Sequence, residues 1–243
     1  MTYLRTFTAE DDAATTVVVF PQSGAGCLRL RTVVPALPAG PHLLGVQMPG
    51  REDRLQDAAP GSLSEVVDRV SSELRDPARR RPMVFLGVSL GAVIAHEVAR
   101  KLESEDAAPG LLVVAAARSP EWWSAFPAAD PPLAELTALL PPSVRGTEPA
   151  RYALAAMASD LRLMAGYRVP SAPLSRTSLR SVAGCRDSIV TSEQMSGWRE
   201  RSTDYRGHQV IDADHHEFMD QDVLVGLLAD AASRTAARRA AHG

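Results

Sequence analysis

The sequence predicts an α/β fold with a mostly parallel central sheet and helices on both of its faces. Short strand-like segments alternate with helix-like segments, and the strand-like segments are continuous apolar runs. Such runs are typical of parallel strands that are covered on both faces. In addition, 45% of the 243 residues are hydrophobic and 23% are charged, as in a globular chain long enough to bury a core.

The expected elements follow one another in a regular order. Strands are expected at residues 16–20, 43–48, 83–87, 111–117, 178–183 and 209–212. Helices are expected at residues 62–74, 90–102, 191–201 and 223–236. Ser62 stands where an N-cap would start the first of these helices. The helices are therefore expected to supply the crossovers that parallel strands require.

The segment from Ser119 to Pro173 interrupts this alternation. It contains nine prolines, with helical patches at 133–140 and 151–164, and it is too long for an ordinary loop between a strand and a helix. Long excursions are either tolerated surface insertions or functional segments. Because two tryptophans and several Met and Leu residues gather here, we expect a helical lid over a pocket. No linker divides the chain, so residues 1–243 are expected to form a single domain.

Charge, cysteine usage and hydropathy argue against several classes of protein. The 26 basic and 29 acidic residues leave a net charge of −3, which gives no support for nucleic acid as a partner. Cys27 and Cys185 form no disulfide framework and lack metal-ligand spacing, so no metal is expected. Residues 1–16 lack the pattern of a secretory signal, and no apolar run approaches the ~20 residues of a membrane span. We therefore expect a cytoplasmic protein with no membrane association.

A G-x-S-x-G pattern at residues 87–91 places a serine, Ser89, between an expected strand and an expected helix. This strand-turn-helix context is that of a nucleophile elbow, whose glycines make room for a sharp turn. The turn raises the Ser89 hydroxyl above the sheet at a helix N-terminus, where partial positive charge favours a developing oxyanion. The alternative is a serine that only caps the helix. We expect Ser89 to be a catalytic nucleophile.

A serine nucleophile needs a base that takes its proton and an acid that orients the base. In folds with a nucleophile elbow, the order along the chain is serine, acid, histidine, each in a loop after a strand. His215 and His216 follow the last expected strand; we expect His215 to be the base, with His216 as the alternative. Asp187 follows the preceding strand and is the expected acid. Its weaker rivals are Asp204, Asp212 and Asp214.

Two backbone N–H groups are needed to hold the oxyanion that forms during acyl transfer. One is expected from Leu90, the residue after the nucleophile, and the other from the small-residue turn at 21–26. Ser23 is the candidate within that turn, and its neighbour Gln22 is the alternative. The turn lacks the third glycine of a dinucleotide fingerprint and the Lys-Ser/Thr of a P-loop, which argues against a phosphate-binding role.

Several segments of the chain match one known family of enzymes. They are Phe20-Pro21 with the turn after it, the string Gln47-Met48-Pro49-Gly50-Arg51-Glu52-Asp53-Arg54, the elbow and its helix, Ser159-Asp160-Leu161, residues 184–187, and Asp214-His215. Together they resemble the type II thioesterases, stand-alone α/β-hydrolases that accompany modular polyketide and nonribosomal peptide synthases. The Pro-Gly-Arg-Glu-Asp-Arg string is the most specific part, because the hydrolase fold in general does not require it.

Three positions depart from the pattern of this family. Val88 stands where these enzymes often have His, and Gln22-Ser23 replaces a pair of the His-Ala type. The segment 213–216 replaces an ending of the Gly-Gly-His-Phe type. The last two departures bear on the oxyanion turn and on the choice between the two histidines.

The resemblance implies an α/β-hydrolase fold and the hydrolysis of acyl groups held as thioesters on the phosphopantetheine arm of an acyl or peptidyl carrier protein. It implies Ser89 as nucleophile, His215 as base and Asp187 as acid, with Leu90 and Ser23 as oxyanion amides and with no cofactor. The departures leave a product-releasing or acyl-transferring role as an alternative. A carboxylester hydrolase acting on a small molecule and a non-catalytic protein that docks on a synthase are the remaining alternatives.

Overall fold

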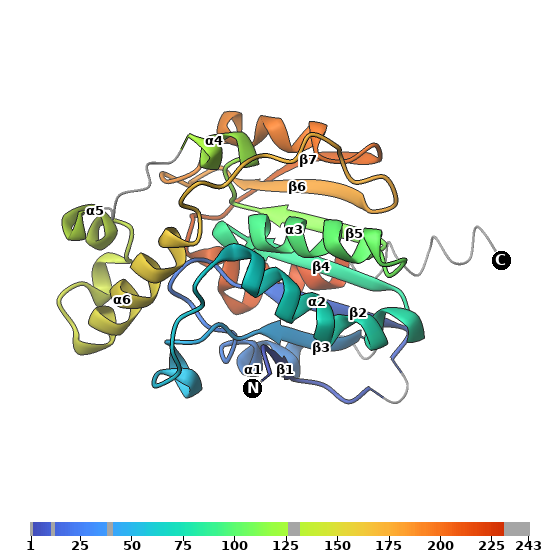
Figure 1. Cartoon of the computed structure of the whole chain (residues 1–243). Helices are drawn as coiled ribbons and strands as arrows, with labels where there is room; N and C mark the ends of the chain where they lie inside the picture. Colours follow the sequence, from blue (N-terminus) through green and yellow to red (C-terminus); the bar gives the residue numbers. More distant parts are fainter. Residues whose placement is uncertain (1, 11–12, 38–40, 126–131, 231–243) are drawn as a thin grey trace.

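The computed structural model describes residues 2–10, 13–37, 41–125 and 132–230, and in these ranges it shows a seven-stranded sheet between helices (Figure 1). The strands are β1 (Leu4–Thr6), β2 (Thr15–Phe20), β3 (Pro41–Val46), β4 (Met83–Val88), β5 (Leu111–Ala115), β6 (Ser178–Gly184) and β7 (Tyr205–Ile211). Their order across the sheet is β1-β3-β2-β4-β5-β6-β7, with only β1 and β3 antiparallel among these pairs. The predicted α/β class with a mostly parallel sheet is confirmed.

Helices join the strands. The α-helices are α1 (Leu30–Val33), α2 (Leu63–Arg80), α3 (Leu90–Ser104), α4 (Pro120–Ser124), α5 (Leu133–Ala138) and α6 (Glu148–Arg162), and a further helix covers residues 221–230. The 3-10 helices are η1 (Val34–Ala36), η2 (Glu52–Arg54), η3 (Pro142–Val144), η4 (Glu193–Glu200) and η5 (Glu217–Met219). None of the helices in the described ranges is both long and apolar enough to cross a bilayer.

Each face of the sheet carries its own apolar core, because successive side chains of a strand point to opposite faces. Val18 and Phe85 pack on one face with buried residues of α2 and α3. Val17 and Leu86 pack on the other face with α1 and the helix at 221–230. The strands therefore read as continuous apolar runs in the sequence.

Two helices of the sequence prediction begin where their local chemistry requires. Ser62 is the N-cap of α2 and accepts a hydrogen bond from the N–H of Glu65 (3.2 Å), whose carboxylate accepts from the N–H of Gly61 (2.9 Å). The helix α3 begins directly after Ser89. Both helices run past their predicted ends, α2 to Arg80 and α3 to Ser104.

Strands β1 and β7 and the segment 191–201 are among the elements that differ from the sequence prediction. Strand β1 was not expected. The Glu73 carboxylate fixes the start of this strand, because it accepts hydrogen bonds from the N–H groups of Tyr3 and Leu4. Strand β7 begins four residues before its predicted start at Gln209. The predicted helix at 191–201 is the 3-10 helix η4, anchored by the buried Trp198, whose Nε1 donates to the Ala117 carbonyl (2.8 Å).

The segment 119–173 contains α4, α5, η3 and α6, so its predicted helical patches are present as α5 and α6. Residues 126–131 of this segment, and residues 231–236 of the predicted closing helix, lie outside the described residues. Figure 1 shows α5 and α6 beyond one end of the strands. Helix α6 reaches the turn after β2: a Cβ placed on Gly24 would lie 2.9 Å from the Ala153 carbonyl oxygen and 3.2 Å from the Met157 Cβ.

Candidate active site

The turn between β4 and α3 holds Ser89 in a backbone conformation that few side chains adopt. Its φ is 52° and its ψ is −124°, and the residue is half-buried. The turn is possible only with glycine on both sides: a Cβ at Gly91 would lie 2.3 Å from the Phe20 carbonyl oxygen, and one at Gly87 would lie 2.4 Å from the Ala92 Cα. This is the geometry predicted for a nucleophile elbow, with the serine at the N-terminus of a helix.

Asp187 and His215 are in direct contact. The Nδ1 atom of His215 lies 2.8 Å from Oδ2 of Asp187, and the two side chains are 10% and 0% exposed. The other carboxylate oxygen of Asp187 accepts from the N–H groups of Ile189 and Val190, each at 2.8 Å. Burial alone would raise the pKa of Asp187, but the hydrogen bonds from His215 and from these two amides outweigh it and hold that pKa below its usual value.

Ser89, Asp187 and His215 all lie at one edge of the sheet. They follow β4, β6 and β7 respectively. The strands of this parallel sheet end level with one another, since the last residue of β4 pairs with the last of β5, and the last residue of β6 pairs with the last of β7. Adjacent strands lie about 4.8 Å apart, so the loops after them are close neighbours. In the part of the chain that the structure describes, no hydrogen bond joins the Ser89 hydroxyl to His215. Such bonds are often long in the free enzyme and tighten when substrate binds.

The other candidates of the sequence prediction have different partners. His216 donates its backbone N–H to Asp214 (2.8 Å), and its ring stands edge-on to that of His215 with the ring centres 5.9 Å apart. Burial lowers the pKa of His216, and the neighbouring His215 lowers it further. The Asp204 carboxylate accepts from Ser178, and that of Asp212 accepts from Arg186. Among the candidate acids of the sequence prediction, Asp187 is the one whose carboxylate hydrogen-bonds the His215 ring.

The turn at residues 21–26, which holds the second candidate oxyanion amide, has a defined shape. The N–H of Ala25 donates to the Gln22 carbonyl (3.1 Å), and Gly24 has a φ of 76°. A positive φ at the third residue is what a type II turn requires. Ser23 is therefore the second residue of the turn. Leu90 is the first residue of α3, so its N–H has no acceptor one helical turn earlier.

The string at residues 47–54 lies against this turn and holds its backbone. Three of its side chains make hydrogen bonds to main-chain groups of residues 25–28. They join Gln47 Oε1 to the Cys27 N–H (2.7 Å), Glu52 Oε2 to the Leu28 N–H (3.0 Å) and Arg51 Nη1 to the Ala25 carbonyl (3.2 Å). The most specific string of the resemblance thus braces the backbone beside the candidate oxyanion amide.

Comparison with known proteins decides the family. Residues 15–232 match the model of the thioesterase domain family, which is most of the chain. This chain belongs to the thioesterase family. The predicted resemblance to type II thioesterases of polyketide and nonribosomal peptide systems is confirmed.

One curated relative of this thioesterase-family chain is a probable cadicidin biosynthesis thioesterase of Streptomyces griseus. It is 29% identical over 208 residues, which cover 83% of this chain and 57% of that protein. Another is thioesterase PikA5 of Streptomyces venezuelae, 27% identical over 83% of this chain and 74% of that protein. The antimetabolite synthetase AmbE of Pseudomonas aeruginosa is 28% identical, and the match spans 9% of its length. The chain thus covers little more than half of the first of these relatives and a small part of the synthetase.

Solved structures share the fold. The type II thioesterase BorB from the borrelidin biosynthetic cluster superimposes with a TM-score of 0.79 at 24% identity, over 95% of this chain and 97% of that one. The type II thioesterase YbtT from the yersiniabactin pathway gives a TM-score of 0.81 at 21% identity, over 96% and 99% of the two chains. The predicted α/β-hydrolase fold is confirmed by these likenesses.

Arg118 is a residue beside the candidate active site that the sequence prediction missed. It follows β5, donates from Nη2 to the Ile189 carbonyl (2.8 Å), and places its guanidinium carbon 4.3 Å from the centre of the Trp122 ring. Burial lowers the pKa of Arg118, and the charge of Asp187 opposes that shift. Arg118 therefore braces the loop whose amides hold Asp187. No motif marks this arginine, since the contact depends on a loop far away in sequence.

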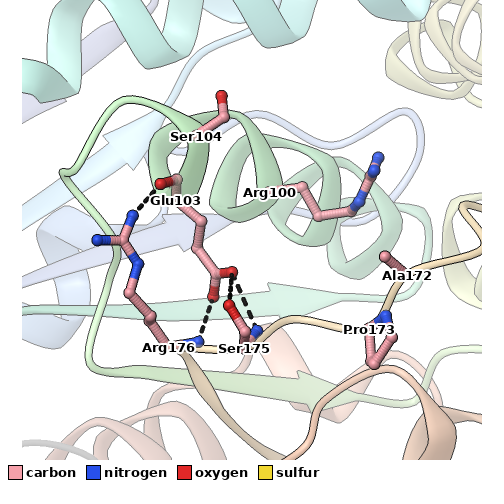
Figure 2. Close-up of a pocket in the computed structure, with 7 residues that line it drawn as sticks. All are labelled: Arg100, Glu103, Ser104, Ala172, Pro173, Ser175 and Arg176. Atoms are coloured by element: carbon pink, nitrogen blue, oxygen red, sulfur yellow. Dashed lines mark hydrogen bonds between the residues drawn. The ribbon is translucent and has the colours of Figure 1, made fainter.

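A surface hollow at the other end of α3 is separate from the candidate active site. Figure 2 shows this hollow, which has a volume of about 380 Å³ and is lined by residues that include Arg100, Glu103, Ser175 and Arg176. The carboxylate of Glu103 accepts from the N–H groups of Ser175 and Arg176, so it ties α3 to the loop before β6. The rise along α3 from Ser89 to Glu103 is about 21 Å, which separates the two residues. These contacts serve the fold and not the candidate catalytic site.

The two cysteines lie in different surroundings. Cys27 is buried and Cys185 is exposed. Burial raises the pKa of the Cys27 thiol to about 12, so this thiol is protonated at neutral pH. Among the described residues, no group of three or more His, Cys, Asp or Glu side chains is arranged to hold a metal ion.

Proposed function

We propose that this protein hydrolyses acyl thioesters carried on the phosphopantetheine arm of an acyl or peptidyl carrier protein, in a polyketide or nonribosomal peptide synthase system. The observation that supports this proposal most is the buried contact of 2.8 Å between His215 and Asp187, at the edge of the sheet where the strained elbow presents Ser89. Membership of the thioesterase family supports thioesters as the class of substrate.

In the proposed acylation step, His215 takes the proton of the Ser89 hydroxyl through Nε2. The Nδ1 atom of His215 is committed to Asp187, whose ionised carboxylate fixes the ring and stabilises its charged form. The Ser89 oxygen then attacks the thioester carbonyl, and a tetrahedral oxyanion forms. His215 returns its proton to the leaving thiolate, which departs with the carrier protein.

The oxyanion is proposed to be held by the N–H groups of Leu90 and Ser23. Leu90 lies at the N-terminus of α3, where the unpaired N–H groups give a partial positive charge. Ser23 lies in the turn after β2. The Phe20 carbonyl at the end of β2 lies so close to Gly91 of the elbow that no side chain fits at position 91. Two fixed donors in a buried site stabilise an oxyanion without reorganising when it forms.

Deacylation is proposed to follow the same path with water in place of the serine. His215 activates the water, and Ser89 leaves from the second tetrahedral intermediate. We propose that the segment 119–173 is a lid that controls access of water and of the acyl chain. The packing of this segment supports the proposal, because it lies against the body of the protein. Its side chains Trp123, Leu136, Met157 and Met164 belong to the apolar core on the α2 and α3 face of the sheet.

The test is a substrate panel applied to the wild type and to Ser89→Ala. The panel contains an acyl carrier protein loaded with a short acyl group, the corresponding acyl-N-acetylcysteamine thioester and the corresponding ethyl ester. The wild type is expected to prefer the carrier-bound thioester, and Ser89→Ala is expected to be inactive on all three. Equal hydrolysis by Ser89→Ala would overturn the proposed chemistry, and a preference for the ethyl ester would overturn the proposed substrate class.

A further inference from the structure

A buried ion pair stands directly behind the candidate oxyanion turn. The carboxylate of Asp160, on α6, meets the guanidinium of Arg51 through two hydrogen bonds, of 2.7 Å to Nη1 and 2.6 Å to Nη2. The side chains of Arg51 and Asp160 are 5% and 4% exposed. Such two-pronged contacts fix both partners in orientation as well as in distance.

The same carboxylate also holds the turn. Oδ2 of Asp160 accepts a hydrogen bond from the backbone N–H of Gly24 at 2.8 Å, across 136 positions of sequence. Arg51 adds a second contact, to the Ala25 carbonyl at 3.2 Å. The ion pair therefore hydrogen-bonds the turn at the Gly24 N–H and at the Ala25 carbonyl. Because Asp160 belongs to α6, the pair also joins the turn to the segment 119–173.

The N–H of Gly24 belongs to the central peptide of the turn. In type I and type II turns this peptide has opposite orientations, and the φ of 76° at Gly24 is that of type II. By accepting this N–H, Asp160 holds the type II form. The Ser23 N–H lies in the preceding peptide, whose carbonyl, that of Gln22, closes the turn by accepting from Ala25. The preceding peptide has the same orientation in both turn types, so what Asp160 sets by anchoring Gly24 is the place of the turn, and with it the position of the Ser23 N–H.

Stability alone does not explain a buried pair of charges at this place. Removing two charges from water is costly, and replacing a buried ion pair with apolar residues of similar size is often neutral or stabilising. The pair is instead well suited to fix one geometry, because the buried carboxylate receives three hydrogen bonds from two different parts of the chain. Precise aim is what an oxyanion donor needs.

We propose that Asp160, fixed by Arg51, is a positioning residue for the oxyanion hole, which it aligns by anchoring the Gly24 N–H and thereby the position of the Ser23 amide. This inference rests on the proposed serine-hydrolase function. It makes α6 part of the catalytic framework, so the segment 119–173 and the oxyanion turn are coupled through one carboxylate.

The experiment compares Asp160→Asn with the double variant Arg51→Met/Asp160→Leu. The first keeps the shape of the side chain and removes its charge. The second removes the buried charges together, so it remains folded if the single variant does not. Asp106→Asn is the matched control, because it makes the same chemical change in an exposed ion pair with Arg176, away from the site. Thermal unfolding and active-site titration give the folded fraction of each variant.

Two rates are measured for the folded protein. One is the rate at which a fluorophosphonate labels Ser89, which needs the oxyanion hole but no thioester. The other is kcat for acyl-N-acetylcysteamine thioesters of short and long chains. We expect both rates to fall about 10-fold to 100-fold in the two variants, less than the 10²–10³-fold of losing an oxyanion donor outright. We expect KM to stay within about twofold, with the same loss for every chain length, because the lost interaction acts in the transition state.

The outcomes separate this inference from the proposed function. Folded variants that label and turn over at the wild-type rate would overturn the positioning role and leave the proposed function intact. A loss confined to KM, or one that varies with acyl length, would also overturn it, because it would assign the pair to the acyl pocket. A wild type that the fluorophosphonate does not label would overturn the proposed function and this inference with it.

Discussion

The backbone strain at Ser89 leads to a prediction about stability. Both Ser89→Ala and Ser89→Gly remove the hydroxyl, but only glycine adopts a φ of 52° with a ψ of −124° without strain. A non-glycine residue in such a region costs about 1–3 kcal/mol. Glycine also loses more chain entropy on folding, which offsets about 0.4–1 kcal/mol of that gain. Ser89→Gly is therefore expected to be more stable than Ser89→Ala by about 1 kcal/mol.

Thermal unfolding followed by circular dichroism measures this difference. For a chain of this size, about 1 kcal/mol corresponds to a rise in Tm of about 2–4 °C. The control is Ala155→Gly at an exposed position inside α6, where the same change to glycine is expected to lower stability by about 1 kcal/mol. If Ser89→Gly melts at or below the Tm of Ser89→Ala while the control behaves as expected, the elbow stores no strain and the reasoning is refuted.

Further predictions concern the candidate triad and the thiols. Asp187→Asn is expected to lower kcat by about 10⁴-fold, because the carboxylate that orients His215 is lost; a loss below tenfold in steady-state kinetics would contradict that role. His215→Gln is expected to abolish thioester hydrolysis, whereas His216→Phe, which keeps an aromatic ring beside His215, is expected to retain most of it; the reverse result would make His216 the base. At pH 8, iodoacetamide is expected to modify the exposed Cys185 quickly and Cys27 only after denaturation, since a pKa of about 12 keeps the Cys27 thiol protonated; fast modification of both in the native protein, seen by mass spectrometry, would disprove this.

The elements that sequence alone predicted are those fixed by local chemistry. A strand such as β4 is an apolar run buried on both faces, and the elbow after it needs glycine at 87 because the turn brings Ala92 within 2.4 Å of a Cβ at that position. The order of Ser89, Asp187 and His215 followed from the rule that serine, acid and histidine come in this order along the chain, each in a loop after a strand. The direct contact of Asp187 with His215 agrees with that expectation, while their catalytic roles stay predictions.

The features that sequence could not predict depend on contacts between distant segments. Strand β1 has only three residues and owes its place to β3 and to Glu73 on α2. Arg51 and Asp160 are 109 positions apart, so no periodicity or spacing relates them. Both residues stand in segments that carry the family resemblance, but that resemblance does not show that the two side chains meet, and their burial is known only from the fold. The same holds for Arg118, whose partner is a backbone carbonyl and leaves no trace in composition.

The acyl-enzyme on Ser89 is the most direct test of the account. The wild-type protein is mixed with an acylated carrier protein, quenched in acid within milliseconds to seconds, digested and analysed by mass spectrometry. Because a thiolate leaves easily, deacylation is expected to be the slower step, and the acyl mass is expected to accumulate on the peptide that contains Ser89. Release of the acyl group with no acyl mass on that peptide at any time, or with the mass on another residue, would contradict the account.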